Sequence, residues 1–126
     1  MTAVVLDAGA LICVERGDRR TDVLLRRNAE HADAAVLIPA GALAQVWRDG
    51  RTQHALSRLL GQRDVTVVPL DERQARRAGA LCGAAGTADV IDASVVVVAL
   101  DRDAPVATTD PEDLRRLDPS VRLVSL

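Results

Sequence analysis

Short apolar runs alternate along this chain with longer stretches in which apolar and polar residues are mixed. The short runs are rich in valine, leucine and isoleucine, which is typical of buried strands, whereas the longer stretches have the length and composition of helices. The pattern predicts strands at residues 4–6, 35–38, 65–68, 106–108 and 122–124. It predicts helices at residues 8–15, 21–32, 42–48, 52–60, 71–85, 89–101 and 111–117.

One run, residues 94–100, is ambiguous because its four consecutive valines favour a strand. We expect a helix, since the segment that begins at Asp89 is longer than an ordinary strand. It also leads through a tight polar turn directly into another buried strand. A helix this apolar has no polar face, so we expect it to be buried on most sides.

Strands that alternate with helices predict a mainly parallel sheet with helices on both faces, which is an α/β fold. The length of 126 residues suits one domain, so residues 1–126 are expected to form a single unit. In such sheets ligands bind beyond the carboxyl ends of the strands. The residues that follow each predicted strand are therefore the first place to look for function.

Composition narrows the class of protein. One Trp and no Phe or Tyr leave an aliphatic core, and a net charge of −2 does not by itself indicate a nucleic-acid binder. Cys13 and Cys82 lack the spacing of a metal site, so we expect buried thiols in a reducing compartment. No signal peptide is recognisable, and the longest apolar run, residues 93–100, is too short to span a membrane. We expect a soluble, cytoplasmic protein.

Aspartates follow the predicted strands. Asp7 comes directly after the first strand, and Asp110 comes soon after the fourth, so a parallel sheet brings both to one edge. Asp89 and Asp92 open the apolar helix, and their i, i+3 spacing places them on one helical face. Asp113 follows Asp110 at the same spacing.

Each of these acids could instead cap a helix, which contributes about 1 kcal/mol. Asp92 resembles a cap least, because it leads straight into an apolar run. Capping also does not explain why several acids meet at one edge, since two carboxylates ~4 Å apart repel by on the order of 4 kcal/mol at an effective dielectric near 20. A bound Mg²⁺ or Mn²⁺ reverses the sign of this interaction, and such ions activate water for phosphodiester hydrolysis.

Three segments carry a resemblance to a known family. VVLDAGALI near the N-terminus, DVIDASVVVVA in the second half and ATTDPEDLRRL near the end resemble the PIN domain, and more narrowly the VapC-type toxins of bacterial toxin–antitoxin systems. The resemblance covers nearly the whole chain. It implies a three-layer α/β/α sandwich and a Mg²⁺- or Mn²⁺-dependent ribonuclease with an RNA substrate. It also implies a homodimer that a cognate antitoxin protein inhibits.

By position, the resemblance makes Asp7, Asp92 and Asp110 the catalytic and metal-binding acids. It makes Asp89 and Asp113 auxiliary. Thr108 and Thr109 stand where the family often has a hydroxyl beside the last acid, and they are auxiliary as well.

The segment IPAGALAQVWR departs from the family, which usually has a glutamate on this helix a few residues before an arginine. Here Gln45 takes that place. Glutamine keeps a carbonyl oxygen for hydrogen bonding or weak ligation, but it removes a negative charge and so should weaken metal binding. The alternative function is therefore a catalytically weak PIN-like module that binds RNA or a partner protein.

Other residues have two interpretations. Arg48 and Arg51 could grip phosphate in RNA, or they could be solvated charges on a helix. Trp47 could stack a base, or it could belong to the core or to a dimer contact. Glu15 lies about 12 Å beyond Asp7 along the first helix, so a surface or supporting role is expected.

A third class of function is a small phosphatase or receiver-like domain in which Asp7 is the nucleophile. Two observations weaken it. The residues after Asp7 are Ala-Gly-Ala rather than a second acid two positions on, and the sequence contains no lysine, which receiver domains use near the acid.

Overall fold

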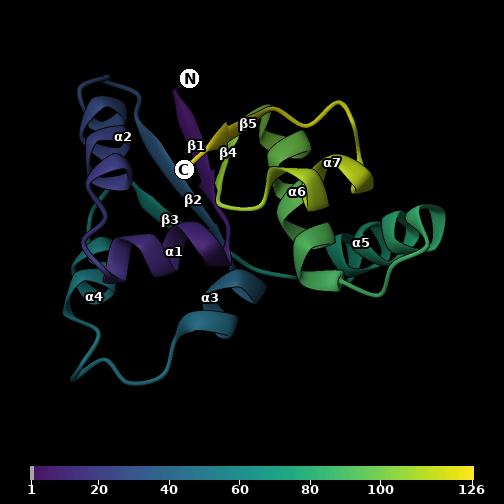
Figure 1. The fold of residues 1–126 in the computed structure, drawn as a ribbon, viewed down its shortest axis with the longest axis horizontal. Coiled ribbons are helices and arrows are strands. Elements are labelled where there is room, and N and C mark those ends of the chain that lie inside the picture. Colours follow the sequence, from purple (N-terminus) through teal and green to yellow (C-terminus); the bar gives the residue numbers. More distant parts are fainter. Residues whose placement is uncertain (1) are drawn as a thin grey trace.

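The computed structural model describes residues 2–126, which form five strands and seven helices (Figure 1). The strands are β1 (Ala3–Leu6), β2 (Ala35–Pro39), β3 (Val65–Val68), β4 (Val106–Thr108) and β5 (Leu123–Ser125). The helices are α1 (Ala8–Glu15), α2 (Arg19–Ala29), α3 (Ala40–Val46), α4 (His54–Leu60), α5 (Glu72–Ala85), α6 (Val90–Arg102) and α7 (Pro111–Leu117). Each predicted strand and helix is present.

The strands form one sheet in the order β3-β2-β1-β4-β5, and every neighbouring pair is parallel. The register places Leu6 opposite Ala107, so β1 and β4 end side by side at the centre of the sheet. Asp7 directly follows β1, and β4 is followed after Thr109 by Asp110. The predicted parallel sheet is confirmed, and the carboxyl ends of its two central strands share one edge.

Helices cover both faces of the sheet, which gives three layers. In Figure 1, α1, α2 and α4 lie on one side of the strands, and α5, α6 and α7 lie on the other. Within the layers, α1 packs against α2, α3 and α4, and α6 packs against α5, α7 and the central strands. The α/β/α sandwich that the resemblance implied is confirmed.

The ambiguous valine run is helical. Helix α6 is buried at every position of 93–99, which confirms the expected burial on most sides. Asp89 caps its first turn, and Asp103 ends it in a left-handed conformation with φ of 49°. Both of these features mark helix ends, so they favour a helix over a strand for this segment.

Several boundaries differ from the predicted ones, by one to three residues. Helix α2 begins at Arg19 because the Asp18 carboxylate accepts a hydrogen bond from the backbone N–H of Thr21 and so caps the helix earlier than expected. Helix α3 ends at Val46, not at Arg48, because Trp47 is extended with ψ of 131°. Strand β5 is shifted by one residue towards the C-terminus.

The two cysteines are free thiols. Cys82 is buried as expected, but Cys13 is only partly buried, which corrects the prediction for that residue. Within residues 2–126 no single helix is long and apolar enough to cross a membrane; α5 and α6 reach that length and composition only as a pair bent by 113°.

Candidate metal centre

Asp7 is the only one of the five predicted acids that is fully buried, with 6% of its surface exposed. It follows β1 and caps α1, where its Oδ1 accepts a hydrogen bond from the backbone N–H of Ala10 at 2.8 Å. Burial raises the pKa of Asp7, while the Thr108 hydroxyl and the backbone N–H groups of Ala10 and Gly9 oppose that rise. The residue is thus both a helix cap and a buried acid at the sheet edge.

Two threonines connect the end of β4 to this acid. Thr108 is fully buried, and its Oγ1 accepts a hydrogen bond from the backbone N–H of Asp110 at 2.9 Å. Thr109 packs against α1 so closely that a Cβ atom at Gly9 would collide with its Oγ1. Only glycine permits this approach of α1 to the chain after β4. The two predicted auxiliary threonines therefore both lie beside the first acid.

Asp89 and Asp92 stand together at the start of α6. Asp89 accepts a hydrogen bond from the backbone N–H of Asp92 at 3.0 Å and so caps the helix. Asp92 is half-buried, and its pKa is raised to about 7. Burial is the largest cause, and the charges of Asp89, Asp7 and Asp113 add to it. Asp92 is therefore partly buried among other negative charges.

Asp110 and Asp113 complete the acidic group from α7. Asp110 precedes this helix without a side-chain capping bond and is exposed. A hydrogen bond with Asp113 is the main cause that raises the pKa of Asp110, and the charges of Asp113 and Asp7 raise it further. Arg116 opposes the rise, and its Nη1 lies 3.5 Å from Oδ1 of Asp113. The sequence analysis missed this arginine, although its i, i+3 spacing from Asp113 was a usable signal.

The five acids form one electrostatic group at the end of β1, at the start of α6 and in the segment after β4. The charge of Asp7 raises the pKa of both Asp92 and Asp110, and so does the charge of Asp113. A cleft between α5, α6 and α7 is lined by Asp89, Asp92 and Asp113, whereas Asp7 and Asp110 lie outside it. As the side chains stand, no three acid, histidine or cysteine groups within residues 2–126 are close enough together to hold an ion.

Gln45 lies on the exposed side of α3 and makes no polar side-chain contact within the described part of the chain. The start of α3 does lie against α6, because a Cβ atom at Gly41 would approach Cδ1 of Ile91 to 2.7 Å. Ile91 is the residue before Asp92, so α3 begins next to the acid-bearing end of α6. That Gln45 itself faces the acids stays a prediction.

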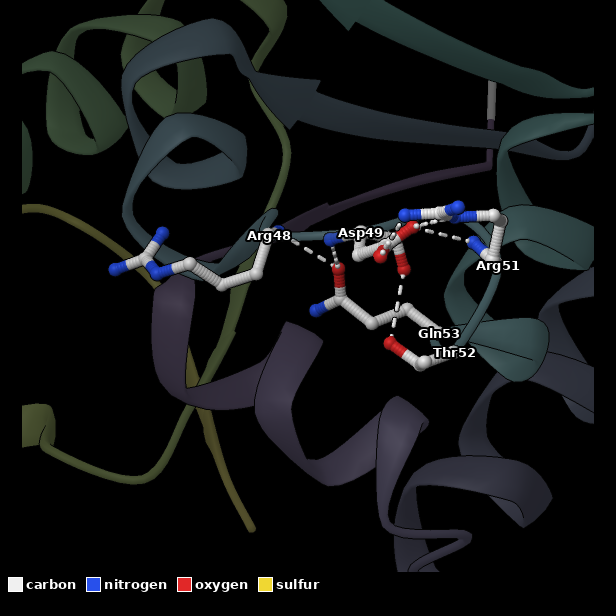
Figure 2. A network of polar contacts seen from close by, with 5 residues as sticks. All are labelled: Arg48, Asp49, Arg51, Thr52 and Gln53. Carbon is white, nitrogen blue, oxygen red and sulfur yellow. Dashed lines mark hydrogen bonds and ion pairs between the residues drawn. The ribbon is translucent and has the colours of Figure 1, made fainter.

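The segment between α3 and α4 is held by a polar network around Gln53 (Figure 2). The Gln53 Oε1 accepts hydrogen bonds from the backbone N–H groups of Arg48 and Asp49 at 2.7 and 2.9 Å, and its Nε2 donates to the carbonyl of Val46 at 2.7 Å. One side chain thereby fixes the turn that follows α3. Sequence reasoning missed Gln53, since a network within an irregular segment has no periodic signal.

The two arginines of this segment differ in their availability. Arg51 forms a two-pronged pair with the Asp49 carboxylate, with distances of 3.2 and 3.1 Å, so its charge is already matched. Arg48 points away from that pair in Figure 2 and donates to the carbonyls of Trp47 and Ala44 at the end of α3. Neither lies on a helix, which corrects the interpretation of both as helix-surface charges.

Glu15 has a structural partner. Its Oε2 accepts a hydrogen bond from the backbone N–H of Leu56 in the first turn of α4, at 2.8 Å. Helix α4 has no capping bond from the side chain that precedes it. Glu15 supplies this capping interaction from another helix, which agrees with the expected supporting role.

Comparisons with known proteins agree with this fold. The family model of the PIN domain matches residues 4–119. No curated protein matches the sequence. The structure is similar to a chain in the crystal structure of VapBC2 from Rickettsia felis bound to a promoter DNA fragment, with a TM-score of 0.75, 14% identity and 98% of each chain covered.

Two further solved structures have a similar fold. A toxin–antitoxin complex from Klebsiella pneumoniae gives a TM-score of 0.71 at 17% identity, with 97% of this chain and 96% of that chain covered. FitAcB from Neisseria gonorrhoeae gives a TM-score of 0.63 at 18% identity, with coverage of 97% and 96%. At such identities these likenesses show the fold alone.

Proposed function

Because the chain belongs to the PIN-domain family, whose members are generally nucleases, we propose that it is an endoribonuclease. The proposed reaction is the hydrolysis of RNA phosphodiester bonds with the aid of Mg²⁺ or Mn²⁺. The single observation that carries the proposal is the electrostatic coupling of acids from three separate elements. Asp7 follows β1, Asp92 lies in α6 and Asp110 follows β4. Beside the larger effects of burial on Asp92 and of Asp113 on Asp110, the charge of Asp7 adds to the rise in pKa of both.

The donor set fits a hard divalent cation. Carboxylate oxygens are the ligands that Mg²⁺ and Mn²⁺ prefer. Burial is the main cause of the raised pKa of Asp92 and a hydrogen bond with Asp113 is the main cause at Asp110, but the negative charge of neighbouring carboxylates adds to both rises, and Arg116 opposes the rise at Asp110. Asp7, Asp92 and Asp110 would hold the cation. When bound, it would lower the pKa of a coordinated water and stabilise charge that develops on the phosphate.

The surrounding residues have positioning roles in this proposal. The Ala10 N–H holds one oxygen of Asp7, and Thr108 fixes the backbone at Asp110 while its hydroxyl favours the charged form of Asp7. Asp89 orders the first turn of α6 and so directs Asp92. Asp113 adds negative charge beside Asp110 and is itself paired with Arg116.

We propose that the protein acts as the toxin of a toxin–antitoxin pair, in the cytoplasm, as a homodimer under the control of an antitoxin protein. Support comes from the three sequence motifs and from similar folds in solved structures that are described as toxin–antitoxin assemblies. A small neighbouring reading frame that encodes a DNA-binding antitoxin would support this assignment.

A second candidate is a catalytically weak module of the same fold that binds RNA or a partner protein. Gln45 favours it, because this exposed neutral side chain stands where the family usually has an acid. The absence of a closely spaced ligand triad among residues 2–126 favours it as well. The two candidates differ in whether RNA is cut.

The test is an assay of single-stranded RNA cleavage with the full chain in Mn²⁺ or in EDTA. The matched control is Asp64→Asn, because Asp64 precedes β3 at the opposite edge of the sheet and its side chain makes no polar contact. We expect wild type and Asp64→Asn to cleave in Mn²⁺ only, and Asp92→Asn to be at least a hundredfold slower. Cleavage by Asp92→Asn at the wild-type rate would overturn the assignment, and binding without cleavage by wild type would favour the second candidate.

A further inference from the structure

A groove lies between α2 and the C-terminal residues, away from the acids. Arg19, Arg20 and Arg27 line it together with Val23, and Val124 and Leu126 line the opposite wall. We call it the arginine groove. Figure 1 shows the C-terminus running from β5 towards α2, where this groove is formed. None of its residues belongs to the acidic group, so it requires an explanation of its own.

The walls of the arginine groove are largely apolar. Val23 is 41% exposed and Val124 is 37% exposed, and both are among the large hydrophobic residues that the fold leaves open to solvent. They face one space from two elements. Exposed apolar side chains that share a groove with a charged rim are typical of a protein-binding surface.

The three arginines are unpaired. Arg19, Arg20 and Arg27 form no ion pair and no side-chain hydrogen bond within residues 2–126, although the charge of Arg20 helps to lower the pKa of Asp18. Another arginine of the same helix, Arg26, does pair, with its Nη2 3.2 Å from Oδ2 of Asp22. The groove therefore has a concentrated positive charge that its own surroundings do not match.

Strand β5 adds free backbone groups. It lies at the edge of the sheet and pairs only with β4. The Leu126 N–H donates to the Thr108 carbonyl and the Arg122 carbonyl accepts from Val106, so residues 122, 124 and 126 face β4. Backbone groups alternate along a strand, so the N–H and C=O of Leu123 and Ser125 face away from the sheet. Such an edge can accept an extended segment.

We propose that the arginine groove and the edge of β5 together bind an extended segment of a partner protein in which apolar residues alternate with aspartate or glutamate. The acids would pair with the arginines of α2, and the apolar side chains would cover Val23 and Val124. Single-stranded RNA suits the groove less well, because its walls are aliphatic and lack the aromatic side chains on which bases stack. The proposal does not depend on RNA hydrolysis.

The experiment measures binding of fluorescein-labelled probes to the full chain by anisotropy. The first probe is a twelve-residue peptide that alternates valine or leucine with glutamate, the second has lysine in place of glutamate, and the third is a twelve-nucleotide oligouridylate in EDTA. The charge-reversed variant is Arg20→Glu/Arg27→Glu. Its matched control is Arg16→Glu/Arg63→Glu, two exposed arginines outside the groove with no ion pair.

We expect the glutamate peptide to bind at least tenfold more tightly than the lysine peptide. The charge-reversed variant should bind the glutamate peptide at least tenfold more weakly than wild type, and the control variant should bind it with a Kd within twofold of wild type. Val124→Ser should also weaken binding of the glutamate peptide, although it changes no charge. This variant keeps the test valid if the double variant folds poorly. Equal binding of the glutamate peptide to the charge-reversed variant and to its control would overturn the proposal. So would loss of oligouridylate binding alone in the charge-reversed variant, or wild-type self-association that this variant abolishes.

Discussion

The backbone N–H of Asp92 donates a hydrogen bond to Oδ1 of Asp89 at 3.0 Å, and the charge of the Asp89 carboxylate raises the pKa of the Asp92 carboxyl group. One contact therefore has two consequences. It caps the buried helix α6, and it places negative charge beside the acid in the first turn of that helix. Capping and repulsion therefore act together at the start of α6.

The first prediction is a loss of stability as the pH rises. The pKa of Asp92 is about 7 in the folded protein and 3.8 in an unfolded chain. Between these values the folded state binds more protons, so the free energy of unfolding falls as the pH rises from about 4 to about 7. Partial exposure reduces the effect, and we expect a loss on the order of 1–3 kcal/mol. Urea denaturation in EDTA at pH 5 and pH 8 measures it.

Asp92→Asn should remove most of this pH dependence and should be more stable than wild type at pH 8 without metal. The raised pKa values of Asp7 and Asp110 act in the same direction, so a weaker slope should remain. Asp64→Asn serves as the control and should keep the full slope. If the free energy of unfolding of Asp92→Asn depended on pH as steeply as that of wild type, a group other than Asp92 would be responsible for the pH dependence.

The second prediction concerns Thr108. Thr108→Val keeps the shape of the side chain but removes the acceptor for the Asp110 N–H and the hydroxyl that opposes the rise in the pKa of Asp7. We expect the free energy of unfolding to fall by about 1–3 kcal/mol, because a partly buried N–H group loses its partner. Thr108→Ser keeps the hydroxyl and should recover at least half of the loss. Equal losses in both variants would mean that packing, not the hydroxyl, is responsible.

The third prediction separates Glu15 from the acidic group. Glu15→Ala removes the acceptor for the Leu56 N–H and should destabilise the protein by about 1 kcal/mol, as loss of a helix cap does. Glu15→Gln keeps an acceptor oxygen and should lose less. Thermal denaturation checks both variants. A change in Mn²⁺ affinity for Glu15→Ala would show that Glu15 belongs to the metal site after all.

Much of the fold was predictable because its signals are local. Runs such as residues 65–68 are too short for helices, and the proline of Asp110-Pro111 marks a helix start that the structure confirms. The end of α3 was not predictable in the same way. It depends on the amide of Gln53, which reaches back to Val46 across an irregular segment. No periodicity encodes such a contact.

The gathering of the acids at one edge of the sheet was predictable, whereas their role as metal ligands stays a prediction. Parallel strands bring Asp7 and Asp110 to one edge whatever their side chains do, so position along the chain was sufficient. The exposure of Gln45 and the pairing of Arg51 with Asp49 depend on side-chain packing in three dimensions. The place of Arg116 beside Asp113 did have a local signal, the i, i+3 spacing. The sequence shows which charged residues are present, but not which of them are already paired with an opposite charge within the protein.

The fourth prediction concerns Gln45. If its helix brings it towards the acids, Gln45→Glu adds a negative charge beside Asp7. Without metal we expect lower stability, and with metal we expect Mn²⁺ binding about tenfold tighter, which corresponds to about 1.4 kcal/mol. RNA cleavage should equal or exceed that of wild type. Gln62→Glu, on an exposed residue outside the group, should change stability by no more than about 0.5 kcal/mol. Equal Mn²⁺ affinity of Gln45→Glu and wild type would mean that Gln45 does not face the site.

The central claim is that Asp7, Asp92 and Asp110 form one divalent-cation site. Calorimetric titration of Mn²⁺ at pH 8, above the pKa of Asp92, tests it most directly in wild type and in Asp7→Asn, Asp92→Asn, Asp110→Asn and Asp64→Asn. The account predicts at least tenfold weaker binding in each of the first three variants and affinity within twofold of wild type in Asp64→Asn. Wild-type affinity in any of the first three variants would contradict it.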